Sequence, residues 1–192
     1  MILPELQLVY LHPTKTAGMA VENAFFRQFL GVDVYNGEHS DEIDRYYPHD
    51  SQHFGHAELL AVLPHVANWR KCVTVRHPYD RALSEFKFQR RDGRTQHREV
   101  NAAVRDGSLW SGPGALPYHD KPQADYLAPN AMILRCETLD DDWSLLSTVL
   151  GAKLPPLKKI NVSHGGCGLT DESQAIIYER FKDDFVLLGY EP

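Results

Sequence analysis

The stretch Leu6-Gln-Leu-Val-Tyr-Leu11, with the segment His12-Pro-Thr-Lys-Thr-Ala-Gly18 after it, decides the fold of this chain. A short apolar run with little alternation is typical of a strand buried on both faces. Apolar residues from Val21 to Phe29 then recur at helical spacing, and Gly31 suits the end of a helix. The chain therefore opens with a strand, a tight loop and a helix.

The same strand-and-helix unit recurs along the chain. Further strands are expected at 71–75 and 131–134, and further helices at 80–91, 142–150 and 171–183. The segments 36–55 and 107–122 are expected to be loops, because they are polar or rich in Gly and Pro. Strands that alternate with helices predict an α/β fold, here a single domain over 1–192 with a mostly parallel sheet flanked by helices.

Composition excludes several classes of protein. The 192 residues carry 20 Lys and Arg against 26 Asp and Glu, a formal charge of −6, which argues against a general nucleic-acid binder. No apolar run is long enough to predict a membrane span, and the N-terminus lacks the pattern of a signal peptide. The three cysteines, at 72, 136 and 167, are expected to be reduced thiols. Together these features predict a cytoplasmic protein.

Positive charge is concentrated in one window of this acidic chain. Residues 66–105 contain ten Lys and Arg but four Asp and Glu. One interpretation is a solvated basic helix face, and the other is a surface that meets a ligand carrying several negative charges.

Two segments have the composition of anion sites. The loop 12–18 places small residues and Lys15 between a strand and a helix, where backbone N–H groups and the helix dipole favour an anion. It is not a Walker A loop, because the required glycine spacing is absent. Arg76 follows the second strand and Ser84 lies in the next helix, which suits a second phosphate. Ligands of open α/β sheets bind beyond the carboxyl ends of strands, so both segments are at the expected edge.

These segments resemble the cofactor motifs of sulfotransferases that use 3′-phosphoadenosine 5′-phosphosulfate (PAPS), in the branch of carbohydrate and heparan sulfotransferases. The first motif of that branch reads H-I-P-K-T-A-G-T-S, and residues 12–20 here read H-P-T-K-T-A-G-M-A. The second reads V-R-(D/H)-P-x-x-R-x-x-S, and residues 75–84 match each fixed position. Weaker similarities follow in the family's order at 123–127, 133–139, 161–163 and 184–190. The resemblance implies a P-loop-kinase-like sulfotransferase fold.

The resemblance also implies a reaction and its residues. The chain would transfer a sulfuryl group from PAPS to an acceptor hydroxyl, leaving 3′,5′-ADP, without a metal. Lys15 would stabilise the leaving phosphate. The residues implied to bind the cofactor are His12, Lys15, Thr16, Ala17, Gly18, Met19, Ala20, Arg76, Arg81, Ser84 and Ser163. The acceptor would be a sugar, a lipid head group or a small metabolite, recognised by the 36–55 and 107–122 loops.

The acceptor hydroxyl needs a base, and His56 is the first candidate. This branch often keeps a His or Glu about twenty residues before the second motif, and an imidazole with an ordinary pKa suits a base at neutral pH. Glu58 is the reserve candidate. His49, His53 and His56 are spaced for one helical face, but Pro48 and Gly55 interrupt a helix there, so a zinc site is the weaker interpretation.

Two alternatives stay open at this point. A nucleotide kinase-like phosphotransferase would need a Walker A loop and a Mg²⁺-holding acid, and the sequence shows neither. Met19 and Ala20 stand where the family has hydroxyl residues, and Pro13-Thr14 inverts the family's order. Those departures favour the second alternative, a module that binds the nucleotide without turnover.

Overall fold

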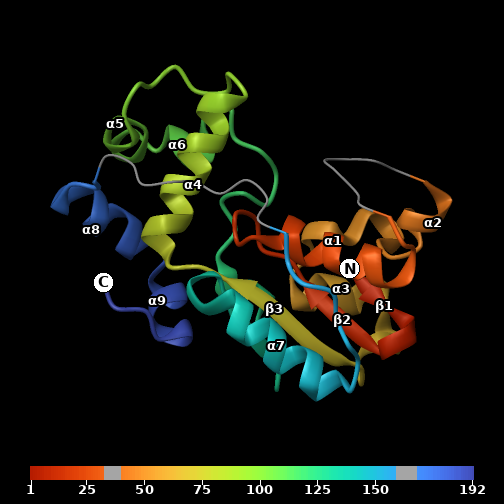
Figure 1. Ribbon diagram of the computed structural model, residues 1–192. Coiled ribbons are helices and arrows are strands. Elements are labelled where there is room, and N and C mark those ends of the chain that lie inside the picture. Colours follow the sequence, from red (N-terminus) through yellow and green to blue (C-terminus); the bar gives the residue numbers. More distant parts are fainter. Residues whose placement is uncertain (33–39, 159–167) are drawn as a thin grey trace. The chain divides into compact units, whose positions relative to one another are not determined.

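The computed structural model describes residues 1–32, 40–158 and 168–192, and divides into two compact units (Figure 1). Unit 1 comprises 1–75 and 125–161, and unit 2 comprises 76–124 and 162–192. Unit 1 holds the sheet and unit 2 is built from helices. The predicted single domain over 1–192 stays a prediction.

The sheet of unit 1 has four strands in the order β1-β2-β3-β4. They are β1 (Ile2–Leu3), β2 (Leu8–Leu11), β3 (Arg70–Val75) and β4 (Met132–Arg135). β2, β3 and β4 are parallel, whereas β1 is antiparallel to β2. The α/β class is therefore confirmed. The expectation of a mostly parallel sheet is wrong, because the sheet is mixed.

A tight hairpin explains the antiparallel strand. The short 3-10 helix η1 (Pro4–Leu6) is followed by Gln7 in the left-handed region, with φ of 47°. This turn reverses the chain, so that Leu3 pairs with Leu8. The apolar run predicted that the first strand begins at Leu6. Because of this turn, the strand begins at Leu8 instead.

Helices of unit 1 cover both faces of the sheet. α1 (Gly18–Phe29) and α7 (Leu139–Leu150) pack on one face with Tyr10, Cys72 and Leu134. Phe25 of α1 contacts Trp143 of α7, with ring centroids 5.1 Å apart. Successive side chains of a strand point to opposite faces, so Lys71 lies on the other face. It shares a pocket there with residues of α3 (His56–Val62).

The remaining elements of unit 1 are short. They are α2 (Asp41–Asp44) and the 3-10 helices η2 (Pro48–His53), η3 (Pro64–Val66) and η5 (Cys136–Thr138). The expected loop 36–55 thus contains two helical segments among its described residues, while 36–39 lie outside them. η4 (Gln123–Tyr126) carries the chain from unit 2 to unit 1.

Unit 2 is a cluster of five helices among its described residues: α4 (Pro78–Arg91), α5 (Val100–Arg105), α6 (Ser108–Ser111), α8 (Asp171–Arg180) and α9 (Lys182–Leu188). Their core includes Phe86, Val104, Trp110 and Ile177. The single helix expected over 171–183 is instead two, because the chain leaves helical geometry at the buried Phe181. α6 lies within the expected 107–122 loop.

Candidate functional site

The loop between β2 and α1, residues 12–17, has the backbone geometry of an anion cradle. Lys15 and Ala17 both have left-handed backbones, with φ of 66° and 63°. Such alternation turns successive N–H groups toward one point, where an anion binds well. The N–H groups of residues 16–19 donate no backbone hydrogen bond within the described chain. They also begin α1, a twelve-residue helix whose dipole favours negative charge there. We call these four N–H groups the cradle.

Buried hydroxyl groups fix the loop to the sheet. Thr16 is fully buried, and its hydroxyl donates to the Pro13 carbonyl over 2.6 Å. The same hydroxyl lies 2.8 Å from Thr74 Oγ1, which in turn lies 2.7 Å from the hydroxyl of Tyr10. The loop is thereby tied to both β2 and β3. Thr16 thus contributes a structural side chain and leaves its backbone N–H to the cradle.

His12 holds the start of α1 in place. Its Nδ1 lies 2.9 Å from Oε1 of Glu22, and its ring covers Gly18. A Cβ added at Gly18 would lie 1.8 Å from His12 Nε2. Gly18 is therefore needed for the space it leaves and not for an unusual φ. His12 is 4% exposed, so the structure gives it a structural position, and its predicted contact with a cofactor stays a prediction.

Glu22 is a buried carboxylate at the centre of a polar network. Besides His12, it accepts a hydrogen bond from Gln52 Nε2 over 3.0 Å. Burial pushes the pKa of Glu22 upward, but the charge and hydrogen bond of His12 outweigh burial, and the pKa falls from 4.5 to about 2. Glu22 is consequently ionised at neutral pH inside unit 1.

His53 also contacts the loop, although the sequence singled out His56. His53 Nδ1 lies 2.9 Å from the carbonyl oxygen of His12, and the two rings meet edge to face with centroids 4.7 Å apart. The hydroxyl of Tyr126 donates to the His53 carbonyl over 3.0 Å. Glu22 is thus a site residue that sequence reasoning missed, and His53, which the sequence offered only for the weaker zinc interpretation, contacts the loop. Neither has a local signal, because their partners are ten or more positions away.

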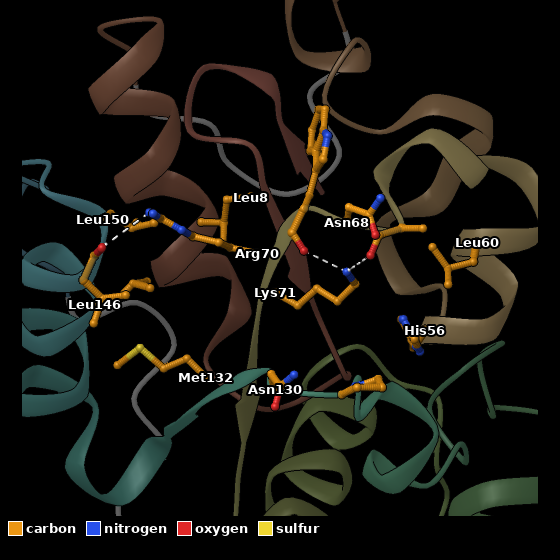
Figure 2. Close-up of a pocket in the computed structure, with 14 residues that line it drawn as sticks. Leu8, His56, Leu60, Asn68, Arg70, Lys71, Asn130, Met132, Leu146 and Leu150 are labelled. Carbon is orange, nitrogen blue, oxygen red and sulfur yellow. Dashed lines mark hydrogen bonds between the residues drawn. The ribbon is translucent and has the colours of Figure 1, made fainter.

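His56, the predicted base, lines a pocket near Lys71 (Figure 2). Burial, and then the charge of Lys71, lower its pKa below the ordinary 6.5, so the ring is neutral at pH 7. This pocket includes the first residues of β3 and β4, whereas Lys15 follows the last residue of β2. Glu58, the reserve candidate, caps α3, because its Oε2 accepts the Gly55 N–H over 2.7 Å.

Unit 2 fixes the backbone of Arg76. The Gln123 side chain accepts the Arg76 N–H over 2.8 Å and donates to the Arg76 carbonyl over 2.9 Å. Gln123 also donates to Asp184, which accepts the Ala124 N–H as well. Arg76 directly follows β3 and is half-buried. These two hydrogen bonds involve the Arg76 backbone and not its guanidinium.

The other predicted residues have varied positions. Ser84 is half-buried on α4, in the same unit as Arg76. Arg81 is 4% exposed, and its guanidinium lies 3.9 Å from Asp184, which makes it a structural residue of unit 2. Met19 is half-buried and Ala20 is buried. Ser163 and Cys167 lie outside the described residues.

Comparison with known proteins gives no family for the chain, since no family model, curated protein or solved structure matches it. Among the described residues, no helix is both long and apolar enough to cross a membrane. No three metal-ligating side chains gather within those residues either, and the side chain of His49 is outside them.

Gly18→Ala tests the role of the ring of His12. The new methyl would displace that ring from Glu22, so we expect the free energy of unfolding to fall by about 2–4 kcal/mol. An exposed helical Gly→Ala change would normally stabilise. Urea unfolding measures the effect. Gly168→Ala is the control, because its Cβ would meet nothing within 4 Å. Equal, small effects of the two substitutions would contradict the packing described.

Glu22→Gln tests the buried carboxylate through its pH dependence. Because the folded pKa of about 2 lies below the ordinary 4.5, ionised Glu22 stabilises the fold above pH 4.5, and this contribution is lost as pH falls toward 2. The pKa difference corresponds to about 3 kcal/mol at pH 7. We expect that cost in Glu22→Gln at pH 7 and a clearly smaller one at pH 3, measured by urea unfolding. Glu42→Gln, at an exposed position, should show neither the loss of stability at pH 7 nor its pH dependence. A loss in Glu22→Gln that does not change with pH would contradict a buried, ionised Glu22.

Proposed function

We propose that the chain is a PAPS-dependent sulfotransferase that transfers a sulfuryl group to the hydroxyl of a small acceptor. The observation that carries the proposal is the cradle, because its converging N–H groups suit the phosphosulfate of the donor. Lys15 belongs to the same loop and adds a cation. The resemblance of the segments 12–20 and 75–84 to the cofactor motifs of PAPS-dependent sulfotransferases favours this donor among anionic ligands.

Each step of the reaction has a residue suited to it. PAPS supplies the sulfuryl group on its 5′-phosphate. His56, neutral at pH 7, would take the proton of the acceptor hydroxyl while the acceptor oxygen bonds to sulfur. The bond from sulfur to the bridging oxygen breaks, and its electron pair stays on the phosphate. Lys15 and the cradle would stabilise that new charge.

Arg76 and Ser84 would hold the 3′-phosphate of the donor. A guanidinium binds phosphate through two parallel hydrogen bonds, and a serine hydroxyl can add a third. Arg76 has its backbone clamped by Gln123, which limits the positions its side chain can reach. Ser84 is eight residues further on, in α4. Arg81, buried in unit 2 beside Asp184, would help to hold α4, and with it Ser84, in position.

A nucleotide-binding module without turnover is the second candidate. Met19 and Ala20 carry no hydroxyl, so the phosphosulfate would be held by backbone groups and Lys15 alone. A kinase-like phosphotransferase is less well supported, because the loop lacks the Walker A glycine pattern. Binding of 3′,5′-ADP or of ATP with Mg²⁺ distinguishes a sulfotransferase from a kinase. Turnover of PAPS distinguishes a sulfotransferase from a module that only binds the nucleotide.

Binding of 3′,5′-ADP tests the donor site. We expect 3′,5′-ADP to raise the melting temperature of the protein, and ATP with Mg²⁺ to have no effect, as measured by differential scanning fluorimetry. Lys15→Ala should abolish the shift given by 5′-AMP and keep that given by 3′-AMP. Arg76→Ala should do the reverse. Exposed Arg94→Ala is the control for charge. Stabilisation by ATP with Mg²⁺ alone would contradict the proposal.

His56→Ala tests the base. We expect it to retain 3′,5′-ADP binding and to lose at least about a hundredfold in turnover with PAPS and a panel of small alcohols and phenols. The wild-type rate should fall as pH drops below 6.5, because the lowered pKa of His56 places its protonation there. Lys71→Met should move this decline to higher pH. His53→Gln is the matched comparison. Full activity in His56→Ala with loss in His53→Gln would reassign the base to His53.

A further inference from the structure

A pocket opens at the edge of the unit 1 sheet where the parallel strands begin, opposite the edge that carries Lys15. We call it the strand-start pocket. It has a volume of about 640 Å³, within the usual range of small-molecule sites. Its fourteen lining residues all belong to unit 1 and include Leu8, Lys71 and Met132, from the first residues of three strands. His56, the proposed base, lines this pocket, whereas the cradle follows β2 and Arg76 follows β3 at the strands' other ends.

The register of the strands creates the opening. Cys72 pairs with Met132, so β3 begins two residues before β4. Arg70 and Lys71 therefore extend past the start of β4 and have no partner residue on that side. Because their side chains point to opposite faces, the pocket reaches both faces of the sheet around this step.

One side of the strand-start pocket is polar and carries positive charge. Figure 2 shows His56 and Asn68 on one side of Lys71. Lys71 is 9% exposed, and its ammonium donates to the carbonyls of Ala67 and Trp69 over 2.6 and 2.7 Å. No carboxylate pairs with it within the described chain, and the fourteen lining residues include no Asp or Glu. Burial lowers the pKa of Lys71, so its positive charge is poorly compensated. An anion would compensate it.

The other side of the pocket is mainly apolar, although the Arg70 guanidinium also lies there and donates to the Val149 carbonyl over 3.4 Å. Figure 2 shows Met132, Leu146 and Leu150 together on the side of Lys71 away from His56. These residues come from β4 and α7, and Leu8 from β2 lies beside Arg70. A ligand chain placed there would be shielded from water on several sides. A charged head without a chain would leave this side unused.

We propose that the strand-start pocket binds a small amphiphilic acid, with its carboxylate at Lys71 and its apolar chain along Met132, Leu146 and Leu150. The third proton of the ammonium is available for the head group, since two are used by backbone carbonyls. Asn68 and Asn130 also line the pocket and carry amide donors. The proposed ligand contacts neither the cradle nor Arg76, although His56, the proposed base, lines the same pocket.

Three probes of one series test the proposal on the wild-type protein without nucleotide. Octanoate has both head and chain, octanol lacks the charge and acetate lacks the chain. By isothermal titration calorimetry below the micellar concentration, we expect octanoate to bind at least tenfold more tightly than either of the others. Octyl sulfate has the same chain and a sulfate head. Weaker binding of octyl sulfate than of octanoate indicates a site for carboxylates, and equal binding indicates a site for anionic head groups in general. Equal binding of octanol and octanoate, or no binding of octanoate, would overturn the proposal.

Variants locate the binding site. Lys71→Met keeps most of the side-chain length and removes the charge, and should weaken octanoate binding at least tenfold while octanol binding is unchanged. Leu150→Gln should weaken both. Exposed Lys153→Met is the control for total charge and should bind as the wild type does. If Lys71→Met does not fold, amide chemical shifts of the wild type decide: octanoate must shift Lys71 and Met132, and shifts elsewhere alone would refute the site.

Discussion

The hydrogen bond between His12 Nδ1 and the Glu22 carboxylate is the interaction on which the loop of unit 1 depends. It joins the end of β2 to the second turn of α1, across the segment whose residues 16–19 carry the cradle. Both partners are buried, so neither exchanges its bond for one to water. The left-handed residues Lys15 and Ala17 are kept in their conformation between these two fixed ends.

Such a buried pair costs desolvation energy as well as contributing attraction. Burial of Glu22 alone would raise its pKa, and the fall of the pKa to about 2 means that the interactions with its neighbours exceed that cost. A pair of this kind stabilises one arrangement of the chain more than it stabilises folding in general. Here the arrangement is a strand, a turn with converging N–H groups and a helix in fixed register. In unit 2 the Arg76 backbone is instead fixed by the Gln123 side chain, which donates to the buried Asp184.

Local patterns were sufficient to predict much of unit 1. The apolar runs at 71–75 and 131–134 are close to β3 and β4, and the helical spacing after Gly18 gave α1. β1 has two residues, too few for any periodicity to appear. Glu22 has the sequence context of an exposed helical residue, because nothing local shows that His12 lies above it. Gln123 and Asp184 are 61 positions apart, and only the folded chain brings them together.

The space filled by the His12 ring also restricts how the loop can change over evolution. A side chain larger than hydrogen at Gly18 fits only after His12 has become smaller, since the ring occupies the position of the missing Cβ. If position 18 changed first, the intermediate sequence would have the His12 ring, and with it the loop, displaced. Positions 12 and 18 should therefore vary as a pair among descendants of this sequence. Any lineage that gains a side chain at 18 must first have given up the imidazole, and with it the partner that keeps Glu22 charged.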